Sequence, residues 1–236
     1  MDGINFGGNG LGGGGNGGNS QSGENGENGE IVQAAGKSDK GKFIVIEGLD
    51  GSGKTTIANL LQEHFAAKNV ASVLTKEPTD NLIGKLIRNV LSGGVYLPIE
   101  SLALLFAADR AEHIIRQISP ALCEKTHVIC DRFIYSSMAY QGRDLPIKTI
   151  LQYNQPWLIV PDVTIFIDTD PAECMHRIAT TRTHTDIYER PKYAKDIRRR
   201  YFEAFDLCAG FMPVSVVDGN CSVEGVLAGV LGVLAG

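Results

Sequence analysis

Residues 48–55 constrain the fold of this chain more than any other segment. They read Gly-Leu-Asp-Gly-Ser-Gly-Lys-Thr, and they lie between an apolar run at 43–46 and an amphipathic stretch at 54–67. Glycines between a strand and a helix let successive backbone N–H groups face an anion at the helix N-terminus. Lys54 adds a positive charge there, and the Thr55 hydroxyl can coordinate Mg²⁺. The pattern therefore predicts a loop that binds the phosphates of a nucleoside triphosphate.

The segments after this loop alternate between apolar runs and helical patterns. The apolar runs are expected to be strands at 43–46, 71–75, 127–130, 163–167 and 213–217. Helices are expected at 54–67, 81–91 and 100–118, the last of them ending before Pro120. Continuously apolar strands that alternate with helices indicate a parallel sheet covered on both faces. We therefore expect a three-layer α/β fold with a five-stranded parallel sheet flanked by helices, and ligands at the carboxyl ends of its strands.

Residues 1–41 differ in composition from the rest of the chain. They contain 15 of the 28 glycines, in runs such as GGGG and ENGENGE, and offer little apolar surface. Such a segment cannot offset the entropy cost of ordering glycine, so we expect a disordered Gly/Asn-rich tail followed by one domain at 42–236. The tail has five acidic and two basic residues, which leaves the domain a net charge of −2 out of the total of −5. This weakly acidic balance argues against a nucleic-acid partner.

Neither a membrane nor an oxidising compartment is indicated. The longest apolar run, 223–235, is interrupted by glycine and is shorter than the roughly 20 residues that span a bilayer. The N-terminus lacks the basic and apolar regions of a secretory signal. The five cysteines are odd in number and form no CxxC pair, which argues against a disulfide framework or a zinc site. We expect a cytoplasmic protein.

Two segments after the loop suit nucleotide contacts, and each leaves an alternative open. Lys76-Glu-Pro-Thr follows a predicted strand and is either a phosphate contact or a solvated loop. Phe106 and Arg110 share a helix face, which suits stacking on a nucleobase and hydrogen bonding to its edge. The alternative is that Phe106 belongs to the core and Arg110 to the surface. His113 lies near the same face and is expected on the helix surface without a role.

Two further segments bear on phosphate transfer. Asp131 and Arg132 close an apolar strand, where the acid resembles the Mg²⁺-associated acid of phosphate-loop enzymes and the arginine is placed to hold a second phosphate. A local ion pair between them is the alternative. The polar segment 180–186 has the character of a mobile loop between helices, which would bring Arg182 to the phosphates or would only connect the helices.

The motifs GLDGSGKTT, KEPT, LLFAADRAEH and DRFIYSSMAYQG occur in this order, and residues 186–190 read Asp-Ile-Tyr-Glu-Arg. Together they resemble the thymidylate kinase family from about residue 42 to the C-terminus, and they leave the tail unexplained. The resemblance implies a P-loop NTPase fold and a nucleotide kinase domain at 42–236, with a lid at about 178–190. It also implies transfer of the γ-phosphoryl group of ATP to dTMP, giving dTDP and ADP for dTTP synthesis, and a homodimer.

The resemblance implies a role for each motif residue. The ATP site would comprise Gly48, Leu49, Asp50, Gly51, Ser52, Gly53, Lys54, Thr55, Thr56 and Arg182. The dTMP site would comprise Asp50, Lys76, Pro78, Phe106, Arg110, Arg132, Ser136, Ser137, Tyr140, Gln141 and Tyr188. The catalytic residues would be Lys54, Asp50, Arg132 and Arg182, and Mg²⁺ would be held by Thr55 and Asp131.

The family keeps a catalytic arginine either in the phosphate loop or in the lid. The loop of this chain has no arginine, so the lid arrangement is expected, with Arg182 as the first candidate and Arg177 as the second. Lys76 stands where an arginine is usual, so a point charge replaces a bidentate fork. Two alternatives stay open: a kinase for another pyrimidine deoxynucleoside monophosphate, such as dUMP or a modified nucleotide, and an ATP-dependent switch without a small-molecule acceptor.

Overall fold

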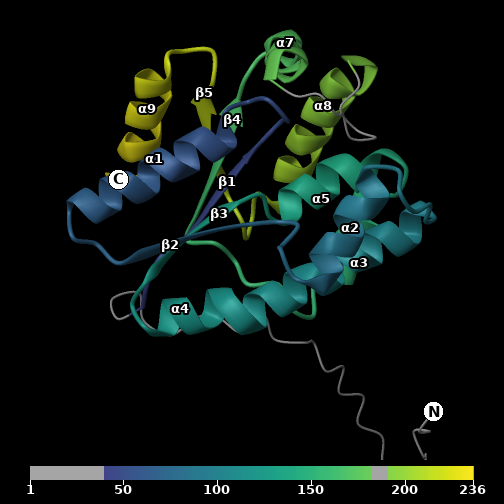
Figure 1. Cartoon of the computed structure of the whole chain (residues 1–236), viewed down its shortest axis with the longest axis horizontal. Helices are drawn as coiled ribbons and strands as arrows, with labels where there is room; N and C mark the ends of the chain where they lie inside the picture. The colour runs from purple at the N-terminus through teal and green to yellow at the C-terminus, as the bar shows by residue number, and fades with distance from the viewer. Residues whose placement is uncertain (1–39, 182–190, 236) are drawn as a thin grey trace, which may run out of the picture. The chain divides into compact units, whose positions relative to one another are not determined.

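Five parallel strands form one sheet in the order β2-β3-β1-β4-β5 (Figure 1). The structure is a computed structural model, and it describes residues 40–181 and 191–235. The strands are β1 Phe43–Gly48, β2 Ser72–Lys76, β3 His127–Asp131, β4 Val163–Asp168 and β5 Val214–Asp218. The expected five-stranded parallel sheet is therefore confirmed, with strand ends that differ from the prediction by one or two residues. Nearly all of the predicted tail lies outside the described residues.

Helices connect the strands and cover the sheet. They are α1 Lys54–Ala67, α2 Leu82–Leu91, α3 Ile99–His113, α4 Ser119–Cys123, α5 Ile134–Tyr140, α6 Ile147–Asn154, α7 Pro171–Thr181, α8 Pro191–Cys208 and α9 Val223–Ala235. A turn of 3₁₀-helix, Gln141–Arg143, continues α5. Among the described helices, none combines the length and the apolar character that crossing a bilayer requires.

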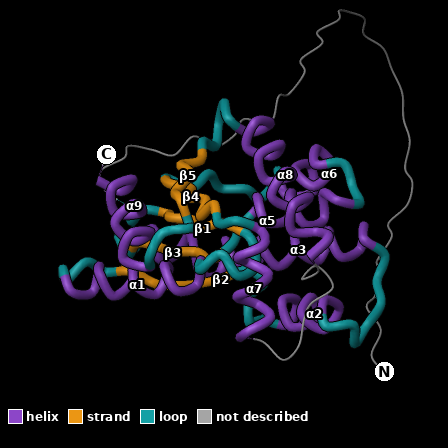
Figure 2. The backbone as a smooth tube through the Cα atoms, turned by 90° about the horizontal axis from the view of Figure 1, so that it is seen from above, coloured by secondary structure: helices purple, strands orange, loops and turns teal. Residues whose placement is uncertain are grey.

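Both faces of the sheet are buried, because successive residues of a strand point to opposite faces. Ile44 and Ile46 of β1 enter a core that also contains apolar residues of α1 and α9. Phe43 and Val45 enter the core on the other face, with residues of α5 and α8. Figure 2 shows α1 and α9 on one side of the strands and α5 and α8 on the other. The strands and the two helical layers form the three-layer α/β arrangement that the sequence predicts.

The carboxyl ends of the central strands meet at one edge of the sheet. Asp131, at the end of β3, is in register with Ile46 of β1 and with Lys76 of β2. Gly48, at the end of β1, is in register with Ile167 of β4. The phosphate loop that follows β1 therefore begins beside the end of β3.

The long helix predicted at 100–118 does not end before Pro120, so this expectation was wrong. Beyond α3 the chain makes one turn of π-helix, Ile114–Ile118, and continues directly into α4. Pro120 lies in the first turn of α4, directly after the π turn. A proline has no N–H for the helix ladder, and its ring crowds the carbonyl four residues earlier in an α-helix. The wider π turn before it changes the pitch, so the helical path continues past the proline.

Candidate active site

The phosphate loop connects β1 to α1 through residues that need the conformational freedom of glycine. Gly51 and Gly53 have φ angles of 79° and 96°, in the left-handed region. A Cβ atom on Gly51 would lie 2.4 Å from the carbonyl oxygen of Cys174, which side chains do not tolerate. Gly53 is the N-cap of α1, so the loop ends where the unpaired N–H groups of that helix begin. The glycine spacing therefore shapes an anion-binding backbone at the sheet edge.

The side chain of Lys54 extends back across the phosphate loop to Leu49. Its Nζ donates a hydrogen bond of 2.6 Å to the carbonyl oxygen of Leu49, and the side chain is buried. Burial, with a smaller contribution from Arg132, lowers the pKa of Lys54 to about 8, against the opposing effect of nearby carboxylates such as Asp50 and Asp131. An anion bound at the loop would stabilise the charged ammonium, so Lys54 is suited to bind a phosphate group.

Thr55 and Asp131 fit a magnesium site. The Thr55 hydroxyl donates a hydrogen bond of 2.5 Å to Oδ2 of Asp131. The other carboxylate oxygen, Oδ1, is buried and has no hydrogen-bond partner in the described part of the chain. An unsatisfied buried oxygen costs free energy, and hydroxyl and carboxylate oxygens are the ligands that Mg²⁺ prefers. The two predicted metal ligands are therefore adjacent, with one ligand atom unused.

Arg132 lies where the phosphate loop meets a second pocket. Its Nη2 is 2.5 Å from Oδ1 of Asp50, and its Nη1 donates to the hydroxyl of Ser136 at 2.9 Å. Tyr140 donates a hydrogen bond of 2.8 Å to the second oxygen of Asp50, and its ring lies 5.0 Å from the guanidinium. Burial alone would lower the pKa of Arg132, but Asp50 and its other neighbours raise it above the ordinary value, so the group stays charged. Its φ of 74° is unusual for a residue with a side chain.

Glu47 holds the segment after Arg132 in place, and sequence analysis missed it. Its Oε1 accepts hydrogen bonds from the backbone N–H groups of Phe133 and Ser136, at 2.9 and 3.1 Å. Its Oε2 accepts from the hydroxyls of Ser136 and Tyr201, at 2.6 and 3.1 Å. Burial raises the pKa of Glu47 even though these donors lower it. The signal available in the sequence was an acidic residue at the end of an apolar strand.

The second pocket is lined from α3, α5 and the loop after β2. Arg110 of α3 is 2% exposed, so the alternative that placed it at the surface is wrong. Its guanidinium contacts Oε2 of Glu77 at 2.6 Å and donates to Oδ1 of Asn154 at 2.5 Å and to the Ser137 hydroxyl at 3.0 Å. Glu77 and Asn154 were also missed, because their roles depend on contacts between distant segments.

Nine of the eleven residues predicted for dTMP line this pocket. They are Asp50, Pro78, Phe106, Arg110, Arg132, Ser136, Ser137, Tyr140 and Gln141. Glu77, Leu91 and Phe133, which the sequence did not single out, complete the lining. We call this cavity the acceptor pocket. That its residues bind a nucleotide stays a prediction.

The remaining predicted residues lie elsewhere. The Lys76 side chain is exposed, with its Nζ 3.5 Å from Asp80, and it lines a separate pocket that also includes Thr55 and Asp131. Arg177 lies on α7, where its Nε is 2.7 Å from Oε1 of Glu173. The lid predicted at 178–190 overlaps the end of α7, and the rest of it, including Arg182 and Tyr188, falls outside the described residues.

A glycine loop that opens a helix at the end of a parallel strand, beside a second pocket lined by charged and aromatic side chains, is the arrangement of a P-loop nucleotide kinase. The family model for thymidylate kinase matches residues 46–224. The chain therefore belongs to the thymidylate kinase family.

Known proteins agree with this assignment. A protein named "probable thymidylate kinase" from Pyrococcus horikoshii is 41% identical over 193 residues, which is 79% of this chain and 92% of that protein. Another with the same name, from Thermococcus onnurineus, is 42% identical over 78% of this chain and 92% of its own. Among solved structures, thymidylate kinase from Candida albicans matches with a TM-score of 0.71 and 28% identity, over 84% of this chain and 93% of that one.

Proposed function

We propose that the protein transfers the γ-phosphoryl group of ATP to dTMP and releases dTDP and ADP. The observation that carries this proposal is the position of Asp50, which belongs to the phosphate loop and also lines the acceptor pocket. Its carboxylate binds Arg132 and Tyr140 from that pocket. Two sites that share a wall allow two nucleotides to meet end to end, which direct phosphoryl transfer requires.

The acceptor phosphate needs charge compensation rather than a base. Its second ionisation is near pH 6, so it is mostly a dianion at neutral pH. Two unit charges about 4 Å apart repel by about 4 kcal/mol at an intermediate effective dielectric. Lys54 and Arg132 both supply positive charge at the junction; Lys54 is buried and the Arg132 side chain is 17% exposed, so water screens their charges only in part. Arg132 would hold the acceptor phosphate in place of part of its contact with Asp50.

The acceptor pocket has unused hydrogen-bonding groups suited to a thymine edge. Nε of Arg110 and Oε1 of Gln141 are buried and have no hydrogen-bond partner within the described part of the chain. The guanidinium can only donate, which suits the O4 acceptor of thymine, and the amide oxygen can accept the N3–H next to it. Cytosine presents an amino donor where thymine has O4, so this pair of groups favours thymine. Phe106 lines the same pocket and would stack on the base.

We further propose that Thr55 and Asp131 hold Mg²⁺ with ATP, since the unused carboxylate oxygen described above gives a ligand position. When bound, the ion neutralises part of the charge on the triphosphate. The arginine that reaches the transferring group would come from the lid, with Arg182 as the first candidate. An arginine added on closure contributes roughly 10³–10⁵ in rate in related phosphoryl transfers.

The direct test is ADP production with a panel of deoxynucleoside monophosphates, each at several concentrations with MgATP. We expect dTMP to stimulate ADP formation and to be converted stoichiometrically to dTDP, with dCMP much the poorer acceptor. If dUMP gives the higher kcat/KM, the protein is a kinase for another pyrimidine nucleotide. If ATP is hydrolysed at the same rate without any monophosphate, the proposal fails and the switch alternative gains support.

We also propose that the protein forms a homodimer. Large apolar side chains are exposed on and beside α2 and α3, namely Leu82 (84%), Tyr96 (89%) and Leu104 (50%). Light scattering coupled to size exclusion would test this, with a monomer mass as the contrary result. A cytoplasmic location stays a prediction from cysteine usage.

A further inference from the structure

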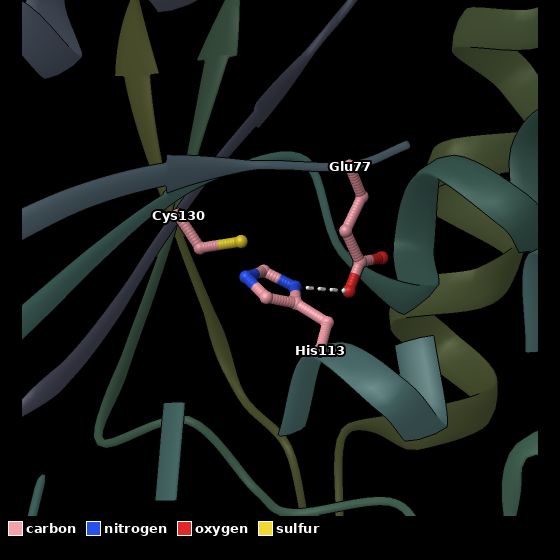
Figure 3. A group of neighbouring side chains, drawn as sticks. All are labelled: Glu77, His113 and Cys130. Atoms are coloured by element: carbon pink, nitrogen blue, oxygen red, sulfur yellow. Dashed lines mark hydrogen bonds and ion pairs between the residues drawn. The ribbon is translucent and has the colours of Figure 1, made fainter. Parts of the chain in front are cut away.

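His113, the last residue of α3, is buried between the acceptor pocket and the pocket that includes Thr55. Figure 3 shows its ring between the carboxylate of Glu77 and the thiol of Cys130. The side chain was expected at the helix surface, but the residue is 1% exposed, so that expectation was wrong. Nδ1 lies 3.1 Å from Oε1 of Glu77, and Nε2 lies 2.7 Å from the Thr75 hydroxyl.

The three side chains drawn in Figure 3 could be taken for a metal site, since their ligand atoms lie within 4.8 Å of one another. The contacts argue against it. Glu77 already has the Arg110 guanidinium on its second oxygen, at 2.6 Å, so a metal ion would lie next to a fixed cation. Both ring nitrogens of His113 have partners, and the Cys130 thiol donates to the carbonyl oxygen of Arg132 at 3.0 Å. Hydrogen bonds instead link Thr75 to His113 and His113 to Glu77, an ion pair links Glu77 to Arg110, and Cys130 bonds to the backbone of Arg132.

This series of contacts ends at Arg110, which lines the acceptor pocket. The two oxygens of Glu77 are divided between two residues of α3, with Oε1 facing His113 and Oε2 facing Arg110. A carboxylate only accepts hydrogen bonds, so Nδ1 of His113 donates to it and fixes its rotation. The plane of that carboxylate in turn fixes the guanidinium of Arg110, which lines the pocket, whereas His113 is absent from its lining.

We propose that His113 is a positioning residue, which orients Arg110 through Glu77 and so sets the affinity and selectivity of the acceptor pocket for the base. The proposal rests on the function proposed above. Loss of the Nδ1–H donor would leave Oε1 of Glu77 buried without that partner, and the carboxylate would turn toward other donors. Arg110 would then lose its fixed geometry, while the phosphate loop, which His113 does not contact, would be unaffected.

Two matched substitutions separate positioning from simple packing. His113→Asn places an amide nitrogen near the position of Nδ1 and can still donate to Glu77, whereas His113→Gln places its amide near Nε2 and faces Thr75. Both remove the ring, and both bury an uncharged amide. We expect His113→Gln to raise the KM for dTMP about tenfold, since a partner of a buried charged group is lost, and to narrow the preference for dTMP over dCMP. His113→Asn should stay within about threefold of the wild type, and the KM for ATP should be unchanged in both.

The measurement is steady-state kinetics with varied dTMP, dCMP and ATP, together with the melting temperature of each variant. Equal effects of the two substitutions on the KM for dTMP, or an effect on ATP of the same size, would overturn the proposal. Thr75→Val provides a second reading if His113→Gln does not fold. It removes the hydroxyl that contacts Nε2 of His113 and Oε1 of Gln117, and it leaves the Nδ1 donor to Glu77 in place. Like His113→Asn, it should keep the KM for dTMP within about threefold of the wild type, and a tenfold rise would refute the role given to Nδ1. Inactive wild-type protein would instead refute the proposed function.

Discussion

Lys54→Met is predicted to stabilise the free protein while abolishing its activity. Burial and the charge of Arg132 lower the pKa of Lys54 from 10.5 to about 8. At 1.36 kcal/mol per pH unit, holding the ammonium charged in the folded protein costs about 3 kcal/mol. Methionine removes this cost and fills a similar volume, but the 2.6 Å hydrogen bond from the charged ammonium to Leu49 is lost, at about 1.5–2 kcal/mol. A net gain of about 1–2 kcal/mol remains, or about 2–8 °C in Tm.

The effect should depend on pH in a defined direction. Below pH 8 the lysine is protonated in both the folded and the unfolded protein, so the full cost is present. Between pH 8 and 10.5 the folded protein releases the proton first, the unfolded protein binds more protons, and wild-type stability rises with pH. The advantage of Lys54→Met should therefore shrink by about 1.4 kcal/mol per pH unit above pH 8 and disappear near pH 9.5.

Urea unfolding at pH 7.0, 8.5 and 9.5, with ADP production measured alongside, tests this reasoning. Lys68→Met, at the exposed end of the same helix, is the matched control and should show no such pH dependence. A variant less stable than the wild type at pH 7, or an advantage in unfolding free energy that stays constant with pH, would show that the buried ammonium does not destabilise the folded protein. Turnover by Lys54→Met at a wild-type rate would remove Lys54 from the phosphate site.

Three other substitutions test separate parts of the site. Phe106→Ala should raise the KM for dTMP about tenfold through loss of stacking, with little change for ATP, and an equal effect on both substrates would remove Phe106 from the base site. Arg182→Ala should lower kcat by about 10³-fold or more with little loss of ATP binding. An unchanged kcat would place the catalytic arginine elsewhere. So would a loss of kcat in Arg177→Ala as large as the one expected for Arg182→Ala. Tyr201→Phe removes a donor to buried Glu47 and should lower the free energy of unfolding by about 1–2 kcal/mol in urea titrations, so wild-type stability would contradict the role given to this hydroxyl.

The sheet could be predicted from the sequence because its central strands β1, β3 and β4 are buried on both faces. Each of these three is a short, nearly continuous apolar run with a clear break, and the glycine loop fixes which run comes first. The path through Pro120 could not be predicted in the same way. A proline ends most helices, and the turn of π-helix that lets α4 follow directly leaves no sequence signal.

The acceptor pocket was predicted through the order of its motifs and not through spacing alone. Phe106 and Arg110 share a helix face, but the sequence left the burial of Arg110 open, because its partners are distant in the chain. Asn154 lies 44 residues from Arg110, and Tyr201 lies 154 residues from Glu47. Buried polar contacts of this kind depend on how helices pack on the sheet, and a periodic pattern carries no information about them.

The charges around the phosphate loop indicate why transfer must depend on more than the described residues. Lys54 and Arg132 face the carboxyl groups of Glu47, Asp50 and Asp131, so the free site is not strongly cationic. The carboxylates allow buried Lys54 and partly buried Arg132 to remain close together without a bound nucleotide, and Asp50 is paired with the guanidinium that the acceptor phosphate would need. An arriving dianion must therefore displace part of an existing ion pair, which costs binding energy in the ground state. We therefore expect the positive charge that favours the transition state to come from the proposed Mg²⁺ bound with the triphosphate and from the predicted lid arginine, which should affect kcat far more than either KM.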